Sequence, residues 1–284
     1  MKTIILNSTN YVSGSNNQFV YNFPSTQKFT TEDQIALAQC AIYNSTFNVS
    51  AALANNQITI TWNANTVTTY VATLPDGYYS YADINTFLQF FCIANKLYVT
   101  TSTTGVNVYF ISLATNSVRY AAQLNFYGLP TAAQATALGY GIPVGAPWLW
   151  PLAASTPQIT FGTIFGSLIG FASGIYPSVV SASTVNLVST STPEVSIVQS
   201  YMMTCNLIRS VMSNPVNTFY SIPLTVGFGS LVIVNPPQLI WNDIDPAYYN
   251  QIVITFFDQN FNKITLNDPD LTITLVINKK ENQK

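Results

Sequence analysis

The sequence contains no histidine among its 284 residues. This absence excludes histidine as a general base, the Ser-His and Cys-His nucleophile pairs, and histidine ligation of zinc or iron. Cysteine is scarce too: Cys40, Cys92 and Cys205 are far apart and form no CxxC pair. An odd, dispersed set predicts buried, reduced thiols rather than a disulfide framework. We therefore expect a protein that is not an enzyme, with no catalytic, cofactor-binding or metal-binding residues.

Charged side chains are scarce as well, at 7% of the chain against about 25% in ordinary soluble proteins. Nine lysines and arginines and eleven aspartates and glutamates give a net charge of −2, too weak a field to hold nucleic acid. No charged residue occurs from position 120 to position 193. The polar surface must then consist of Ser, Thr, Asn, Gln and Tyr, which gives little repulsion between molecules. This deficit predicts a surface that neighbouring subunits cover.

The segment Phe161–Tyr176 carries glycine at every fourth position, which is typical of helix pairing in membranes. The nearest cations, Arg119 and Arg209, are too distant to anchor a span, and Pro177 ends the run. Four glycines would also cost a helix in water about 4 kcal/mol relative to alanine. We therefore expect no membrane span. One extended strand would place the four glycines on a shared face, and two shorter pieces joined at glycine turns are favoured over it.

Alternation of apolar and polar residues with period two dominates the chain and is typical of half-buried strands. In the clearest example, Ile252, Ile254 and Phe256 share one face. Turn residues such as those at 75–77 separate these segments. Many short strands of this kind predict an all-β sandwich or jelly roll. The predicted strands span residues 17–23, 34–43, 57–62, 67–74, 107–113, 195–208, 229–234, 251–257 and 271–278.

One segment has helical spacing instead. Ile84, Leu88 and Phe91 recur at helical intervals, and Ser80 with Asp83 three residues later is a capping signal. These features predict a single helix over residues 81–94. The Pro-, Gly- and Ala-rich stretch 127–158 has no clear period and is too long for a structureless connection inside a core. It predicts an elaborated loop or insertion.

Three close carboxylate pairs are the candidates for a calcium site, because oxygen-rich turns bind this ion. Ordinary turn formation is the favoured alternative, since a calcium site usually needs more oxygens than two carboxylates provide. The pairs are Glu32 with Asp33, Asp243 with Asp245, and Asp268 with Asp270.

Aromatic residues gather near the Pro- and Gly-rich stretch. Trp148 and Trp150, with Tyr140 nearby, could form a platform for a sugar or a receptor. Packing beneath a loop is the commoner role of such residues. Both alternatives remain open from the sequence.

The two ends of the chain are polar. Residues 7–18 have no period and are a candidate for an arm that is ordered only on assembly. Residues 279–284 hold three of the nine cations. This tail is either a weak, salt-dependent contact to packaged DNA or a solvated end.

FGSLIGFASGIYP, at residues 165–177, resembles the glycine-rich LGF-type segment of the penton proteins of virophages and polinton-like viruses. TLPDGYYSYADINTFLQF, at residues 73–90, resembles the segment that precedes it, in which a GYY motif leads into a helix. Further stretches resemble a mid-chain strand and the C-terminal strands of the family, and the match covers roughly half of the chain. They are residues 204–215, 226–239 and 252–277, the last of which is the most specific.

The resemblance implies a single jelly roll with an inserted subdomain that contains one short helix. It places the jelly roll at residues 1–62 and 159–284 and the insertion at residues 63–158. It further implies a structural virion protein that is made in the cytoplasm of the infected host cell. Homopentamers would occupy the fivefold vertices of an icosahedral capsid. Their partners would be double jelly-roll major capsid proteins and minor capsid proteins. No sequence-specific nucleic acid partner and no membrane span are expected.

Two rival functions are weighed against this one. The first is a virion-surface jelly roll that binds a host receptor or glycan. The second is an enzyme on the same fold, as in cupins, but these require metal-binding histidines that this chain lacks.

Overall fold

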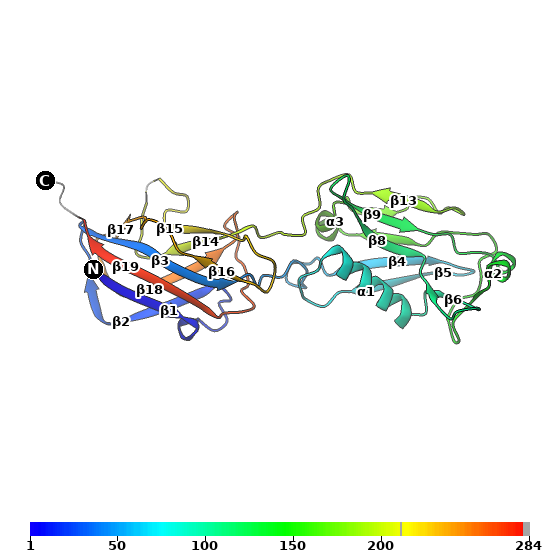
Figure 1. The fold of residues 1–284 in the computed structure, drawn as a ribbon, viewed down its shortest axis with the longest axis horizontal. Coiled ribbons are helices and arrows are strands. Elements are labelled where there is room, and N and C mark those ends of the chain that lie inside the picture. Colours follow the sequence, from blue (N-terminus) through cyan, green and yellow to red (C-terminus); the bar gives the residue numbers. More distant parts are fainter. Residues whose placement is uncertain (211, 281–284) are drawn as a thin grey trace. The chain divides into compact units, whose positions relative to one another are not determined.

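The structure is a computed structural model that describes residues 1–210 and 212–280. The fold is mainly β, with 42% strand and 11% helix, and its sheets are antiparallel. Contacts divide the chain into two compact units (Figure 1). Unit 1 consists of residues 1–46 and of the chain from residue 198 onwards, and unit 2 of residues 47–197.

Unit 1 is a jelly roll. One sheet has the order β1-β19-β3-β16, with β17 also paired to β3, and the other has the order β15-β14-β18-β2. Strands from the two ends of the chain alternate in the first sheet, so that β19 (red) lies between β1 and β3 (blue) in Figure 1, and in the second sheet the N-terminal strand β2 pairs with β18. This interleaving of antiparallel strands in two sheets is that of a jelly roll. The strands are β1 (Lys2–Asn7), β2 (Gln18–Lys28), β3 (Asp33–Tyr43), β14 (Ser200–Cys205), β15 (Thr218–Pro223), β16 (Leu231–Val234), β17 (Asn242–Asp243), β18 (Tyr248–Phe257) and β19 (Leu271–Lys279).

The core of unit 1 follows the period-two pattern of the sequence. Ile252, Ile254 and Phe256 of β18 are fully buried, as predicted. Ile273 of β19 is buried in the same core, whereas its neighbour Thr272 is exposed. Alternation therefore gave the correct inward face of both strands, because successive side chains of a strand point to opposite faces.

Unit 2 contains three further antiparallel sheets, of order β12-β11-β4-β5, β13-β9-β8 and β10-β6-β7. Residues of the first two sheets and of helices α1 and α3 form one hydrophobic core. The strands are β4 (Gln57–Asn63), β5 (Val67–Thr73), β6 (Val99–Thr101), β7 (Asn107–Val108), β8 (Ile111–Asn116), β9 (Ala121–Phe126), β10 (Tyr140–Gly141), β11 (Gln158–Phe161), β12 (Gly174–Tyr176) and β13 (Val185–Val188), and the helices are α1 (Tyr81–Ala94), α2 (Ala132–Leu138) and α3 (Thr163–Ile169).

Helix α1 confirms the prediction for residues 81–94. The Ser80 side chain accepts a hydrogen bond from the Asp83 backbone, and the Asp83 carboxylate accepts one from the Ser80 backbone at 2.9 Å. The Ser80 hydroxyl also donates to the Asp83 carboxylate at 2.6 Å, and this hydrogen bond, followed by the one from the Ser80 backbone, lowers the pKa of Asp83. Ile84 and Leu88 are buried against the core of unit 2.

The prediction of a single helix is corrected by α2 and α3. Both are only seven residues long, too short to show a clear helical period. For α2 the sequence nevertheless held a signal, because Thr131 and Gln134 form a capping box and Gly139 ends the helix in the left-handed conformation. The predicted strand at residues 107–113 is divided between β7 and β8.

The boundaries of the two units differ from the predicted ones. Residues 47–62 and 159–197 belong to unit 2, although the predicted jelly roll included them. The reason is the core that their side chains enter: Ile58, Ile60 and Phe161 pack with α1 and α3 rather than with the jelly roll. Alternation along a strand shows that one face is buried, but not in which core.

The glycine-rich segment folds as strand β11, helix α3 and strand β12, with glycine at each junction. Gly162 is the N-cap of α3, and Gly170 ends the helix with φ of 78°. This arrangement agrees with the prediction of short pieces joined at glycines. Across residues 1–210 and 212–280, none of the helices has the length and apolar character needed to cross a membrane.

Candidate functional site

The four-stranded sheet of unit 2 has an outer face without charge. Its strands β12, β11, β4 and β5 contain no Asp, Glu, Lys or Arg. One row of paired residues crosses all four strands, and it consists of Ile175, Thr160, Thr59 and Val71. We call the outward residues of these four strands the uncharged sheet face. It also includes Gln57, Thr61, Thr69, Thr73 and Gln158.

The uncharged sheet face is accessible in the single chain. Val71 and Ile175 are 59% and 52% exposed. Solvated sheet faces usually carry charged residues, whereas this one carries threonine, glutamine, valine and isoleucine. Such side chains lose water at low cost, because a hydroxyl or amide needs only a hydrogen-bond partner. The face is therefore suited to contact with another protein surface.

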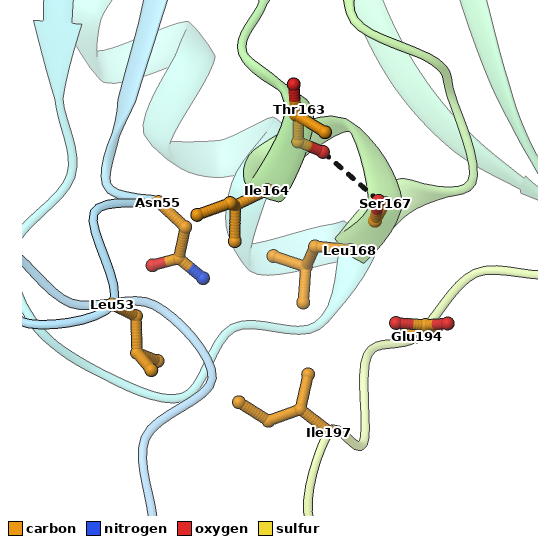
Figure 2. Close-up of a pocket in the computed structure, with 8 residues that line it drawn as sticks. All are labelled: Leu53, Asn55, Thr163, Ile164, Ser167, Leu168, Glu194 and Ile197. Carbon is orange, nitrogen blue, oxygen red and sulfur yellow. Dashed lines mark hydrogen bonds between the residues drawn. The ribbon is translucent and has the colours of Figure 1, made fainter.

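A small hollow lies beside helix α3, and Figure 2 shows its lining residues. Its volume is about 270 Å³. Helix α3 presents Thr163, Ile164, Ser167 and Leu168 to it, and the Ser167 hydroxyl donates to the Thr163 carbonyl at 3.1 Å. The other lining residues come from two loops of unit 2 and are Leu53, Asn55, Glu194 and Ile197.

Glu194 gives this hollow its charge. It is the sole charged residue from position 120 to position 208. Its backbone N–H donates to the Leu168 carbonyl at 3.1 Å, which holds the residue beside α3. Its side chain is exposed and has no ion-pair or hydrogen-bond partner among residues 1–210 and 212–280. Asn55, by contrast, is buried and satisfied, donating to the Asn48 carbonyl at 2.7 Å.

A second hollow, of about 390 Å³, lies between the chain around β12 and strand β13. It is lined by uncharged residues, among them Phe171, Val179 and Leu187. The lining provides no acid, base or nucleophile beyond the hydroxyls of serine, threonine and tyrosine. Without a partner base these hydroxyls are weak nucleophiles.

The three candidate carboxylate pairs have local structural roles. Asp243 accepts from Gln34 at 2.9 Å and pairs with Lys280 at 3.1 Å, and these contacts lower its pKa, the Gln34 hydrogen bond most strongly. Asp268 accepts from the Asp270 backbone at 2.9 Å, as in a turn. Asp33 accepts from the Thr30 backbone at 2.8 Å. The described residues bring no three His, Cys, Asp or Glu together in a metal-binding group.

Trp148 belongs to a core cluster rather than to an open platform. It is 4% exposed, its ring centroid lies 5.4 Å from that of Trp62, and its indole donates to the Lys96 carbonyl at 2.7 Å. Trp150 and Tyr140 pack against the same cluster. The packing alternative is therefore the one that the structure supports.

The N-terminal segment does not form a free arm. Residues Ser8–Asn10 form a short 3-10 helix (η1), and Asn7 and Asn10 make a reciprocal capping box. Tyr11 forms a bridge with Phe19, with ring centroids 5.5 Å apart. The segment thus folds on its own unit without a neighbour. At the other end, Lys279 ends β19 and Lys280 is paired with Asp243, while residues 281–284 of the predicted tail lie outside the described residues.

The three cysteines are free and buried, as predicted. Burial raises the pKa of the Cys40, Cys92 and Cys205 thiols from 9.0 to about 12. The thiols are therefore protonated at neutral pH and unreactive as nucleophiles.

The buried thiols make the stability of the protein dependent on alkaline pH. The unfolded chain releases these protons near pH 9, whereas the folded chain keeps them until about 12. Their contribution to stability is thus fully present below pH 9 and is lost as the pH rises toward 12. We expect the denaturant midpoint to fall above pH 9. The midpoint should fall less with pH in a triple Cys40→Ala, Cys92→Ala, Cys205→Ala variant. An equal fall of the midpoint with pH in the two proteins would contradict the role of the buried thiols.

The hollow beside α3 was not predicted from the sequence, although one signal for it was present. A single carboxylate, Glu194, ends the long uncharged run. The position of Glu194 in the sequence did not reveal that Leu53 and Asn55 line the same hollow. That neighbourhood arises only when the two loops fold onto α3.

No protein-family model matches the sequence. A search of curated proteins gives no significant match either. Among solved structures, the fold is similar to the crystal structure of selenomethionine-labelled mavirus penton protein, a virophage protein. The likeness covers 98% of this chain and 100% of that chain, at 8% sequence identity and a TM-score of 0.43. This neighbour is of the family whose motifs the sequence resembles.

Proposed function

We propose that this protein is a structural virion protein, a penton subunit that forms homopentamers at the fivefold vertices of an icosahedral capsid. The observation that carries the proposal is the uncharged sheet face of unit 2, presented by a chain whose other unit is a jelly roll. A ring of identical subunits needs two different flanks on each subunit that lose water on contact. Surfaces free of charge meet that requirement at low cost.

The family-like motifs coincide with well-defined elements of the fold. Residues 165–177 form most of α3, its glycine end and β12. Residues 252–277 supply most of β18 and β19, which lie inside the two jelly-roll sheets. The motifs thus fall on positions that set the backbone path of both units, which supports the resemblance that they carry.

The proposal includes partners and location. The pentamer would sit in the virion beside double jelly-roll major capsid proteins, and minor capsid proteins are further candidates. The protein would perform no catalysis, in keeping with the sequence, which has no histidine, and with the local roles of the close carboxylate pairs.

The mass of the purified full-length protein tests this function. Sedimentation at micromolar concentration should give a particle of five copies of the 31.1 kDa chain, seen as a ring in negative-stain images. A strict monomer across the accessible concentrations would contradict the penton assignment. A monomer that binds a glycan array would instead favour the receptor-binding alternative.

A further inference from the structure

The hollow beside α3 combines an apolar lining with one unpaired carboxylate. Leu53, Ile164, Leu168 and Ile197 provide apolar side chains around it, and Glu194 stands at one side (Figure 2). Ile164 is 53% exposed and Leu53 39%, so these groups are open to solvent in the single chain. Thr163 and Ser167 add hydroxyl groups to the lining.

This combination selects a particular chemistry of ligand. An anion is repelled by Glu194, and a divalent cation would find one carboxylate where it needs several oxygens. A purely apolar side chain would fill the hollow but would make no favourable contact with the carboxylate. Lysine and arginine carry a long aliphatic stem that packs on apolar surface and a charged head that pairs with a carboxylate. The volume, near the lower end for ligand pockets, fits one such side chain rather than a larger molecule.

Unit 2 does not supply this cation itself. Its positive residues are Lys96 and Arg119. Lys96 is engaged with the Val144 carbonyl at 2.8 Å and the Gly145 carbonyl at 3.1 Å. No ion pair joins Arg119 to Glu194. A cation that pairs with Glu194 would therefore come from outside unit 2.

We propose that the hollow around Glu194 receives a lysine or arginine side chain from a neighbouring protein of the assembly. The stem of that side chain lies on Ile164 and Leu168, and its head pairs with the Glu194 carboxylate. Arginine is the better fit of the two, since its guanidinium can also donate to the Thr163 and Ser167 hydroxyls. This inference rests on the proposed function for the existence of an assembly, and it adds the chemistry of one contact whatever the number of subunits.

Methyl NMR on the full-length protein tests the proposal with a defined probe. The probe is the peptide acetyl-Gly-Arg-Gly-amide, compared with the same peptide carrying citrulline or norleucine in place of arginine. The arginine peptide should give saturable shifts at the methyl groups of Leu53, Ile164, Leu168 and Ile197. Because Glu194 is exposed, the citrulline peptide should bind about fivefold more weakly.

The variant Glu194→Gln should remove the preference for arginine over citrulline. Glu32→Gln is the matched control, since it removes an exposed carboxylate in unit 1 and should leave the preference unchanged. Equal binding of the norleucine peptide would identify an apolar site and overturn the proposal. Absence of shifts at these four residues would overturn it as well. Neither result bears on the mass of the particle, so the penton assignment is tested separately.

Discussion

Gly166→Ala should destabilise unit 2, although glycine-to-alanine changes inside helices ordinarily stabilise by about 1 kcal/mol. The chain that leaves α3 doubles back over this glycine, and the Phe171 N–H donates to the Gly166 carbonyl at 2.9 Å. A methyl group on Gly166 would overlap the carbonyl oxygen of Phe171 and crowd that of Ala172. Since Phe171 packs on Phe161 in the core, the overlap cannot be relieved by a surface movement. We expect a loss of about 1–3 kcal/mol of unfolding free energy.

Gly170→Ala should cost more, because two effects combine. Gly170 has φ of 78°, a conformation that costs an L-residue about 1–2 kcal/mol. A methyl group would also overlap the carbonyl oxygen of Ser191, whose N–H donates to the Gly170 carbonyl at 3.1 Å. Urea unfolding followed by tryptophan fluorescence is a suitable measurement, since Trp62, Trp148 and Trp150 all lie in unit 2.

Gly162→Ala is the matched control for both variants. It lies in the same segment, has φ of −73°, and has no atom within 4 Å of the position of an added methyl group. Its midpoint should fall much less than theirs, since the only expected cost is the poorer preference of alanine for an N-cap. If the midpoint of Gly166→Ala fell as little, the close approach of residues 171–172 to α3 would be refuted.

A lysine on the uncharged sheet face should abolish the pentamer. Thr160 is central in the sheet, paired with Thr59 on one side and with Ile175 on the other. If a neighbouring subunit covers this face, the variant Thr160→Lys buries an unpaired ammonium group at every interface. The cost is several kcal/mol for each fully desolvated charge. Sedimentation should therefore show monomers at concentrations at which the unmodified protein is assembled.

A lysine in unit 1 is the control for this test. Asn260→Lys lies at an exposed turn beside Asp258 in unit 1, so its charge stays solvated and the pentamer should persist. Thr163→Lys and Ser167→Lys are less suitable than Thr160→Lys, because both positions line the hollow that contains Glu194. The new ammonium group could pair with that carboxylate, which would offset the cost of burying it. A pentamer that survives Thr160→Lys would show that this face does not form the interface.

Local patterns in the sequence gave much of the secondary structure. The inward face of β18 followed from the alternation of Ile252, Ile254 and Phe256, and the start of α1 from Ser80 and Asp83. One strand that was not predicted, β1, lacks this regularity, because only Leu6 is fully buried in it and its apolar neighbour Ile5 is 56% exposed. Its pairing with β19, from the far end of the chain, makes it a strand.

Composition and local patterns were sufficient to predict a mainly β fold, a helix at residues 81–94, buried thiols and a surface poor in charge. These properties depend on composition and on neighbours a few positions apart, where side-chain period and capping act. Two other features arise only when the chain is packed: Ile58 and Phe161 enter the core of unit 2 rather than that of the jelly roll, and Glu194 and Leu53 line the same hollow beside α3. Such contacts join segments that are distant in the chain, so they depend on how the strands pair and pack, which no local pattern encodes.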